Sequence, residues 1–505
     1  MVEAANRAIT ALFTALLALV LGVVLLCFAG TEFSCKRPFA LPQWAMLLIG
    51  AAALGGLTLL VRRGRECTPK RPWLAPCLAG LALLGVQLVL CFHAYFITGW
   101  DVRGITESAY AIAGGEADIH AGYLSMYPNN IPLVLIFAAV IRVVRLLLGN
   151  PGLDRCIFVL IALQCVLNTL TAILLWCIAA HETGSRRFAW GVAAVYAVLA
   201  GLSPWLMIPY SDSMALLFPT AVIAVQQAHG EGRMGWSAWP ITGLLAALGY
   251  LIKPQAAIAA IAVALLALLR PGLHGGWART WAKVGCMALA FALLAGPVRQ
   301  MAVQASPIDV KPERKIGMTH FAMMGLNEET NGTYDYDDVV LSCSAATPKE
   351  RRDLELEEIG RRLSGMTAGE LIEHLKKKTL TNFADGTFAW GCEGNFYARQ
   401  LEDKDALLSP FLKSLTDTGS PRFLYLLTVM HCIWLALLLG CVLCGVRVLC
   451  AGVKMESVLP VMMLSLVGLM AFEWIFEARA RYLFLYVPFF VMLGMMGWRG
   501  ARKTA

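Results

Sequence analysis

Charged residues are scarce in this sequence of 505 residues: Asp, Glu, Lys and Arg make up 15% of it, whereas hydrophobic residues make up 58%. The mean hydropathy is +0.65. A water-soluble protein of this length could not bury so many apolar side chains, so the composition predicts a polytopic membrane protein. The net charge of +8 does not indicate nucleic-acid binding, because the basic residues cluster in short loops between apolar runs.

Other familiar features are also missing. No internal repeat or low-complexity linker is evident. The first apolar run, 9–29, is too long and lacks the small-residue cleavage site of a removed signal peptide, so we expect it to be the first span. Most of the 15 Cys lie in apolar runs, where a thiol packs as a small hydrophobe. Cys343 and Cys392 lie in a polar segment and could pair if it is outside the cell, but the sequence alone does not fix their connectivity.

Apolar runs suited to membrane-spanning helices recur along the chain. A spanning helix needs about 20 apolar residues. We therefore predict an all-α polytopic membrane protein with about thirteen transmembrane helices. They are expected at residues 9–29, 43–61, 74–96, 131–148, 156–180, 188–203, 206–227, 239–252, 254–269, 282–300, 422–446, 457–475 and 482–498.

One long polar segment interrupts these runs and divides the chain into three parts. Residues 1–303 form a membrane module with a long loop at 97–130, and residues 422–505 hold the last transmembrane helices. The polar segment 304–421 contains charged helical stretches, with a capping-box pattern from Thr367 to Glu370. We expect it to form a mainly helical cap outside the cytoplasm.

The distribution of Lys and Arg predicts the orientation. Basic loops at 61–72, 270–283 and 447–454 and the C-terminal tail are expected in the cytoplasm. This places the N-terminus inside, and it places Asp101, the cap and the cluster Glu477–Arg481 outside. The predicted topology is inconsistent at one place. Arg186 and Arg187 look cytoplasmic, yet two predicted helices separate them from Asp101, whereas residues on opposite sides of a membrane require an odd number of spans between them. Either one segment between 97 and 203 is short, re-entrant or interfacial, or these two arginines break the rule.

Four polar clusters fall on the predicted outer side, where charged groups at a membrane boundary are costly and so tend to be functional. The catalytic candidates are Asp101, Glu107 and Asp212. The substrate-binding candidates are Tyr127, Asn129, Asn130, Tyr210, Lys253, Glu477, Arg479, Arg481 and Tyr482. Structural readings stay open: Asp101 and Asp212 could cap helices, Lys253 could snorkel, and the Glu477–Arg481 cluster could be an ion-pair network.

Together the clusters suit an anionic lipid head group beside a carboxylate. Arg binds phosphate in a bidentate manner and Lys acts as a point charge, so Lys253, Arg479 and Arg481 suit a polyprenyl-phosphate sugar. A carboxylate must then take the proton of an acceptor hydroxyl, and Asp101 suits that role. The sequence has no nucleotide-binding Gly-rich loop that would indicate a nucleotide-sugar donor.

The layout resembles the GT-C class of membrane glycosyltransferases, near its protein O-mannosyltransferase and lipid A aminoarabinose-transferase branch. The resemblance rests on Trp100-Asp101 in a long outer loop, on Asp212 about 110 residues later, and on the late motif Glu477–Tyr482. It implies a GT-C-like bundle, a lipid-phosphate-linked sugar donor, and inverting transfer on the extracytoplasmic face with Asp101 as base. The family's first loop often has a second adjacent acid, whereas Val102 follows Asp101 here, so Glu107 or Asp212 would have to supply it.

The expected partners are a polyprenyl-phosphate-linked sugar, membrane lipids, and an envelope glycan, lipid or protein as acceptor, without nucleic acid. We predict no cofactor and no metal, although Asp118 and His120 form a pair that could ligate one. The alternative is a transporter or flippase of lipid-linked glycans. Transporters commonly contain an internal repeat with interrupted helices, and none is evident here.

Overall fold

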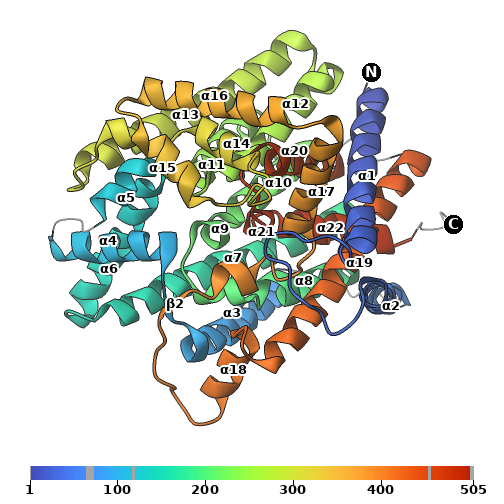
Figure 1. Ribbon diagram of the computed structural model, residues 1–505. Coiled ribbons are helices and arrows are strands. Elements are labelled where there is room, and N and C mark those ends of the chain that lie inside the picture. The colour runs from blue at the N-terminus through green and yellow to red at the C-terminus, as the bar shows by residue number, and fades with distance from the viewer. Residues whose placement is uncertain (1, 64–72, 117–119, 453–456, 501–505) are drawn as a thin grey trace.

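The computed structural model describes residues 2–63, 73–116, 120–452 and 457–500. Within these ranges the chain is predominantly helical, with two short strands (Figure 1), which confirms the all-α prediction. The elements before the cap are α1 Val2–Cys27, α2 Gln43–Arg63, α3 Leu74–Ala94, β1 Ile97–Thr98, α4 Trp100–Gly114, α5 Ala121–Met126, η1 Pro128–Asn130, α6 Ile131–Leu148, α7 Leu153–Thr183, α8 Arg186–Tyr196, η2 Ala197–Gly201, η3 Pro204–Met207, α9 Ser211–Ala215, α10 Leu217–Gly230, α11 Ala238–Ile252, η4 Pro254–Ala257, α12 Ile258–Leu269, η5 Pro271–His274 and α13 Trp277–Ala305.

The remaining elements form the cap and the last membrane helices. They are η6 Pro312–Arg314, α14 Met318–Gly325, α15 Tyr336–Ser344, α16 Pro348–Gly365, α17 Ala368–Phe383, η7 Trp390–Gly394, β2 Tyr397–Arg399, α18 Leu408–Thr416, α19 Pro421–Ala451, α20 Leu459–Ile475, α21 Arg481–Phe484 and α22 Val487–Trp498. Each of the thirteen predicted apolar segments coincides with one or more of these helices.

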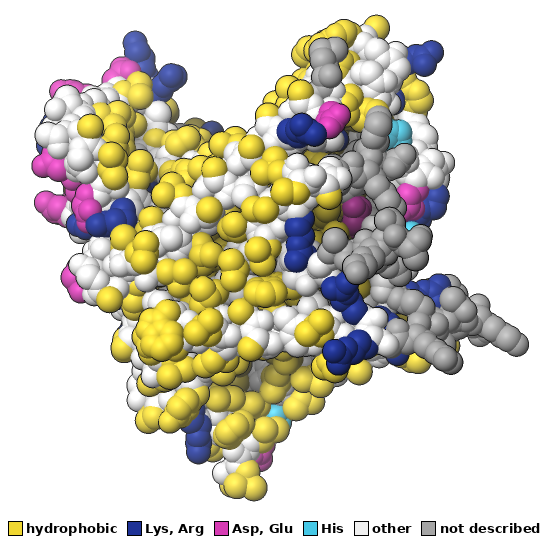
Figure 2. All heavy atoms as spheres, turned by 90° about the vertical axis from the view of Figure 1, so that its right-hand side faces the viewer, with side chains coloured by type: hydrophobic (Ala, Val, Ile, Leu, Met, Phe, Trp, Pro, Cys, Tyr) yellow, Lys and Arg dark blue, Asp and Glu magenta, His cyan; other side chains and the backbone are white. Residues whose placement is uncertain are grey.

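The apolar helices suit a membrane. Among the described residues, seven helices are long and apolar enough to cross one, and four shorter apolar helices accompany them. Figure 2 shows a broad hydrophobic surface across the middle of one face, with Lys and Arg gathered at its right margin. Since an apolar band between charged margins is the expected surface of a chain embedded in lipid, the structure agrees with a multi-pass membrane protein.

Helix α7 runs antiparallel to α3. Cys91 Sγ lies 3.9 Å from Cys165 Sγ, and Gln87 Nε2 donates to Asn168 Oδ1 at 2.9 Å. Because α3 leads directly to Asp101, the start of α7 lies on the same side of the bundle as Asp101. We call this end of the bundle the Asp101 side. The end of α7 lies on the opposite side, where Arg499 Nη2 donates to the Thr183 carbonyl at 2.9 Å; we call it the Arg499 side.

Helix α6 does not cross the bundle, although its length and hydropathy would allow it. It lies alongside α4 (Figure 1), where Arg142 donates to the Ile112 carbonyl at 3.1 Å and Arg145 to the Tyr110 carbonyl at 3.3 Å. Its first residue follows Asn130, and its last residues lead into the start of α7. Both ends of α6 therefore lie on the Asp101 side, which corrects the prediction of a span at 131–148.

The orientation of α6 resolves the imbalance in the charge pattern. Only α7 passes between Asp101 and the pair Arg186 and Arg187, so these arginines lie on the Arg499 side with the other basic loops. Helix α8 and the π-helical turn η2 then return the chain to the Asp101 side. The predicted interfacial or re-entrant segment is thus α6, and the two arginines lie on the same side of the bundle as the other basic loops.

The cap covers the Asp101 side. Its predicted capping box is confirmed: the Thr367 hydroxyl accepts from the Glu370 N–H, and the Glu370 carboxylate accepts from the Thr367 N–H. The end of α17 reaches into the membrane bundle, where Phe383 stacks with Trp434 at 6.5 Å between ring centroids. Strand β2 pairs antiparallel with β1, so the cap is joined directly to the segment that precedes Asp101.

A disulfide joins the cap to the loop that follows α1. Cys392 pairs with Cys35, with their Cα atoms 5.5 Å apart, and Cys343 is a free, exposed thiol. The suggested pair of Cys343 and Cys392 is therefore wrong. The sequence pointed to two cysteines of one polar segment, whereas the fold brings Cys35 to the cap from a sequence distance of 357 residues.

Candidate functional site

Polar side chains from five segments far apart in the sequence meet on the Asp101 side, beneath the cap. They are Trp100 and Asp101 at the start of α4, Tyr210 and Asp212 at the start of α9, Lys253 between α11 and η4, Glu393 in η7, and Glu477 to Tyr482 between α20 and α21. The predicted clusters at Asp101, Asp212, Lys253 and Glu477–Tyr482 are thus brought together.

Asp101 lies in the first turn of α4. Trp100, directly before it, has a φ of 47°, a conformation that non-glycine residues adopt rarely and mostly where the surrounding structure imposes it. The Tyr210 hydroxyl donates to Asp101 Oδ2 at 3.1 Å, and the Trp100 and Tyr210 rings pack edge-to-face at 4.9 Å. Asp101 is half-buried and takes part in none of the ion pairs found among the described residues.

Asp212 is held by two cations. Lys253 Nζ lies 2.9 Å from Asp212 Oδ1, and Arg481 Nη1 lies 3.0 Å from Oδ2. All three side chains are buried, with Asp212 only 2% exposed. A buried carboxylate must be paired to remain charged, so Asp212 is the shared counter-ion of Lys253 and Arg481.

The network continues toward the cap. Arg481 Nε donates to Glu393 Oε2 at 2.9 Å, and Arg479 lies 3.3 Å from the same oxygen. Arg479 also pairs with Glu477 at 2.9 Å, and the Tyr482 hydroxyl donates to Glu477 at 3.0 Å. Burial alone would raise the pKa of Glu477, but the two neighbouring arginines hold it below its ordinary value.

Aromatic rings surround the two innermost cations. Lys253 Nζ lies 4.2 Å from the centroid of the Tyr482 ring. The Arg481 guanidinium lies 4.9 Å from the Trp100 ring and 5.0 Å from the Tyr210 ring. Cation–π contacts of this kind stabilise partly desolvated cations. They also connect Asp101 to the ion pairs, because Tyr210 contacts both.

The predicted residues Tyr127, Asn129 and Asn130 form one wall next to Asp101. Asn130 Nδ2 donates to the Tyr123 hydroxyl at 2.7 Å, and Asn129 Nδ2 donates to Asn130 Oδ1 at 3.2 Å. Burial, together with the nearby Asp101 carboxylate, raises the pKa of Tyr123 well above its ordinary value.

A cavity of about 380 Å³ lies behind this wall. It is bordered by Ser125 and Pro128, by the outer part of α13 with Arg299, and by Lys315 at the start of the cap. The cavity therefore adjoins the wall of the candidate site and carries basic side chains.

Glu107 lies elsewhere. Its carboxylate accepts from Arg103 Nε at 2.9 Å and lies 2.8 Å from His120 Nε2, so it connects α4 to the residue that precedes α5. The structure therefore does not bring Glu107 to the Asp101 cluster, and its predicted catalytic role gains no geometric support. Asp118, the other half of the suggested ligand pair, lies outside the described residues. In the described ranges no three His, Cys, Asp or Glu side chains are grouped as a metal site would require.

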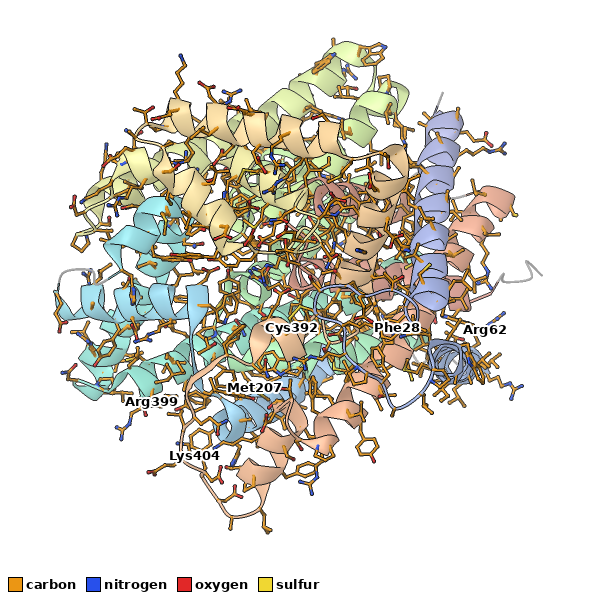
Figure 3. The ribbon with its side chains drawn as sticks, in the orientation of Figure 1. Phe28, Arg62, Met207, Cys392, Arg399 and Lys404 are labelled. Atoms are coloured by element: carbon orange, nitrogen blue, oxygen red, sulfur yellow. A yellow bond between two sulfur atoms is a disulfide. The ribbon has the colours of Figure 1, made fainter. Side chains whose placement is uncertain are left out.

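Glu393 is the site residue that sequence reasoning missed. It lies in the stretch Trp390–Gly394, where it is the one charged residue among apolar and small neighbours. Figure 3 shows Cys392, the residue before it, beside the loop that follows α1. A lone acid between glycines next to a cysteine was the available signal, but only the fold shows that it meets Arg479 and Arg481.

Lys378 of α17 fixes the position of the loop that carries the arginines. Its ammonium donates to three carbonyl oxygens, those of Gly325, Trp474 and Phe476, at 2.7–2.8 Å. In the same region the Ala478 N–H donates to the Gly332 carbonyl at 2.7 Å. The cap is thus bonded directly to the backbone on both sides of Glu477.

Comparison with known proteins identifies the family. The sequence matches the family described as "conserved hypothetical integral membrane protein" over residues 1–502. The chain belongs to this family. Membership establishes an integral membrane protein, in agreement with the apolar helices.

One solved structure to which this chain is similar is that of ArnT from Cupriavidus metallidurans bound to undecaprenyl phosphate. The two chains are 12% identical, with a TM-score of 0.34, and the match covers 84% of this chain and 77% of ArnT. None of the curated proteins matches the sequence significantly.

Proposed function

We propose that this protein is an integral membrane glycosyltransferase that moves a sugar from a polyprenyl-phosphate donor to an acceptor hydroxyl outside the cytoplasm. The supporting observation is the convergence around Tyr210. Its hydroxyl bonds Asp101, while Arg481 and Lys253 lie 5.0 and 5.5 Å from its ring. A carboxylate and two cations at one membrane boundary suit an acid–base group beside a phosphate.

Asp101 is the proposed general base. Asp212 is held between Lys253 and Arg481, whereas Asp101 forms no ion pair with any described residue and accepts a hydrogen bond from the Tyr210 hydroxyl. In the reaction the acceptor oxygen bonds to the anomeric carbon of the sugar and the bond from that carbon to the phosphate oxygen breaks. The hydroxyl proton passes to Asp101, and polyprenyl phosphate leaves.

Lys253, Arg479 and Arg481 are proposed to hold the donor phosphate. Each arginine uses Nε and Nη1 in its described ion pairs, which leaves Nη2 for a ligand, and Lys253 uses one of its three N–H groups. Asp212 and Glu477 orient these cations, and Tyr482 supports Glu477. The wall at Tyr127–Asn130 and the cavity behind it lie where a lipid-linked substrate could enter.

The Asp101 side is proposed to face away from the cytoplasm. The basic loops gather on the Arg499 side, as positive-inside orientation requires. The Cys35–Cys392 disulfide lies on the Asp101 side, and disulfides persist in oxidising compartments. The cap over the site would then select an envelope glycan, lipid or secreted protein as the acceptor.

The test is sugar transfer in membranes supplied with candidate polyprenyl-phosphate sugars. Asp101→Asn keeps the size and hydrogen-bonding capacity of the side chain but cannot take a proton, so transfer should fall by about 10²- to 10⁴-fold. Glu116→Gln, at an exposed position in the same loop, is the matched control and should transfer normally. Wild-type rates in Asp101→Asn at equal expression, or lipid-linked sugar transport without transfer, would overturn the proposal.

A further inference from the structure

A second cavity lies at the opposite end of the same helices, on the Arg499 side. It has a volume of about 100 Å³ and is lined by the end of α10, the start of α11, the end of α12 with η5, and the start of α20. Helix α11 begins at this cavity and ends directly before Lys253. Its 15 residues correspond to a length of about 22 Å. This cavity is therefore distinct from the proposed transferase site.

Arg270 is the central residue of this cavity. Arg270 directly follows the last residue of α12. It is only 4% exposed, yet its Nε and Nη2 atoms have no hydrogen-bond partner. Burial lowers the pKa of this guanidinium to about 10, and no neighbouring carboxylate contributes to offset that effect. A buried charge without a counter-ion is strongly unfavourable, and no described residue supplies a counter-ion to Arg270.

The neighbouring groups are donors and cations as well. The buried indole N–H of Trp239 has no acceptor, and Lys283 Nζ lies 5.7 Å from the Trp239 ring. His229 and His274 also line the cavity. Burial, together with Lys283, His229 and Arg270, lowers the pKa of His274 to about 4.

Two acids near the cavity have other partners. Glu182 accepts from the Ser457 hydroxyl and the Val458 N–H. Glu231 pairs with Arg233 at 2.6 Å and with His181 at 3.5 Å. Among the described residues, therefore, no carboxylate neutralises Arg270.

We propose that this cavity binds a phosphate-class oxyanion, held by the free N–H groups of Arg270 and by the indole N–H of Trp239. The volume suffices for several water molecules and so accommodates one tetrahedral oxyanion. Arginine is suited to such a ligand because its planar fork of donors matches two phosphate oxygens. The oxyanion reaches the cavity either as free phosphate or as the head group of a lipid, and the two arms of the experiment below distinguish these sources.

The experiment measures the melting temperature of the purified full-length protein in phosphate-free buffer. One arm titrates inorganic phosphate against potassium chloride of equal ionic strength. The other compares nanodiscs of neutral phosphatidylcholine with nanodiscs that also contain phosphatidic acid. Arg270→Gln removes the buried charge, while Arg279→Gln removes an exposed positive charge on the same side as a matched control.

Phosphate should raise the melting temperature of the wild type and of Arg279→Gln, with an apparent Kd at least about tenfold weaker in Arg270→Gln. Without phosphate, Arg270→Gln should melt at or above the wild-type temperature, because an unpaired buried charge has been removed. If Arg270→Gln fails to fold, Trp239→Phe should still weaken binding, since it deletes one donor and keeps an aromatic ring. Stabilisation only by phosphatidic acid assigns the ligand to a lipid head group.

The proposal is overturned if neither phosphate nor phosphatidic acid stabilises the wild type, or if all variants respond alike. Because the readout is thermal stability, this outcome is independent of whether the protein transfers sugar.

Discussion

Asp212 is the residue on which the buried network depends. One of its oxygens pairs with Lys253 and the other with Arg481, and Arg481 passes the connection on to Glu393. All of these groups are buried, and removing charged groups from water costs free energy. The attraction between them offsets this desolvation cost only while each partner is present. Losing Asp212 would leave two buried cations with fewer partners.

Asp212→Asn is therefore expected to destabilise the folded protein by about 3–5 kcal/mol. The measurement is thermal unfolding in detergent. Glu3→Gln is the matched control, because the Glu3–Arg7 pair is exposed and such pairs contribute at most about 1 kcal/mol. Equal melting temperatures for Asp212→Asn and the control would show that the network contributes little to stability.

At the scale of elements, α6 and α17 determine the architecture of the Asp101 side. Helix α6 has the composition of a span but lies along α4, because Arg142 and Arg145 bond the backbone of that helix. Helix α17 carries Lys378, which joins the cap to the residues on both sides of Glu477. The side-chain-to-backbone hydrogen bonds of these two helices determine their positions, and hydropathy does not predict such bonds.

The position of α6 predicts which side of the membrane the turn after it faces. In a Cys343→Ser background, Asn150→Cys should react with a membrane-impermeant maleimide on intact cells, because both ends of α6 lie on the Asp101 side. The exposed native Cys450, at the end of α19, is the internal control and should react only after permeabilisation. Labelling of position 150 only after permeabilisation would mean that α6 crosses the membrane.

Lys378 predicts a pH dependence of stability. Burial lowers its pKa from 10.5 to about 7. Between these values the unfolded chain binds the proton and the folded chain does not, so stability rises with pH, by up to about 1.4 kcal/mol per pH unit. Below pH 7 both states are protonated, and this contribution is constant.

The melting temperature of the wild type should therefore rise relative to that of Lys378→Met between pH 7 and pH 9. The comparison between the two proteins removes the contribution of other titrating groups. A constant difference over this range would mean that Lys378 keeps its proton in the folded state.

At the scale of the whole molecule, the bundle separates two polar ends. The Asp101 side carries the acidic and aromatic cluster, the cap and the disulfide, while the Arg499 side carries the basic loops and the cavity at Arg270. Helices α10, α11, α12 and α20 extend from one end to the other. The direction in which this assembly is inserted decides where any chemistry takes place.

The proposed orientation predicts the reactivity of two native thiols. Cys343 in the cap and Cys450 in the last turn of α19 are both exposed. On intact cells the impermeant maleimide should modify Cys343 and leave Cys450 unmodified. The opposite pattern would place the cap in the cytoplasm and would contradict extracytoplasmic transfer.

The sequence by itself determined what depends on neighbouring residues. Hydropathy located the apolar helices, and the spacing of Thr367 and Glu370 located the start of α17, because helix formation and membrane partition are properties of contiguous segments. It also picked out Asp101, Asp212 and Lys253, since polar residues at the ends of apolar runs are conspicuous in any membrane sequence.

Only the tertiary structure decided which distant groups meet. It paired Cys392 with Cys35, brought Glu393 to the two arginines, moved Glu107 away from them, and left Arg270 without a counter-ion among the described residues. The physical reason is that pairing and burial depend on distances through space between helices. Residues 357 positions apart become neighbours only when the whole bundle has packed.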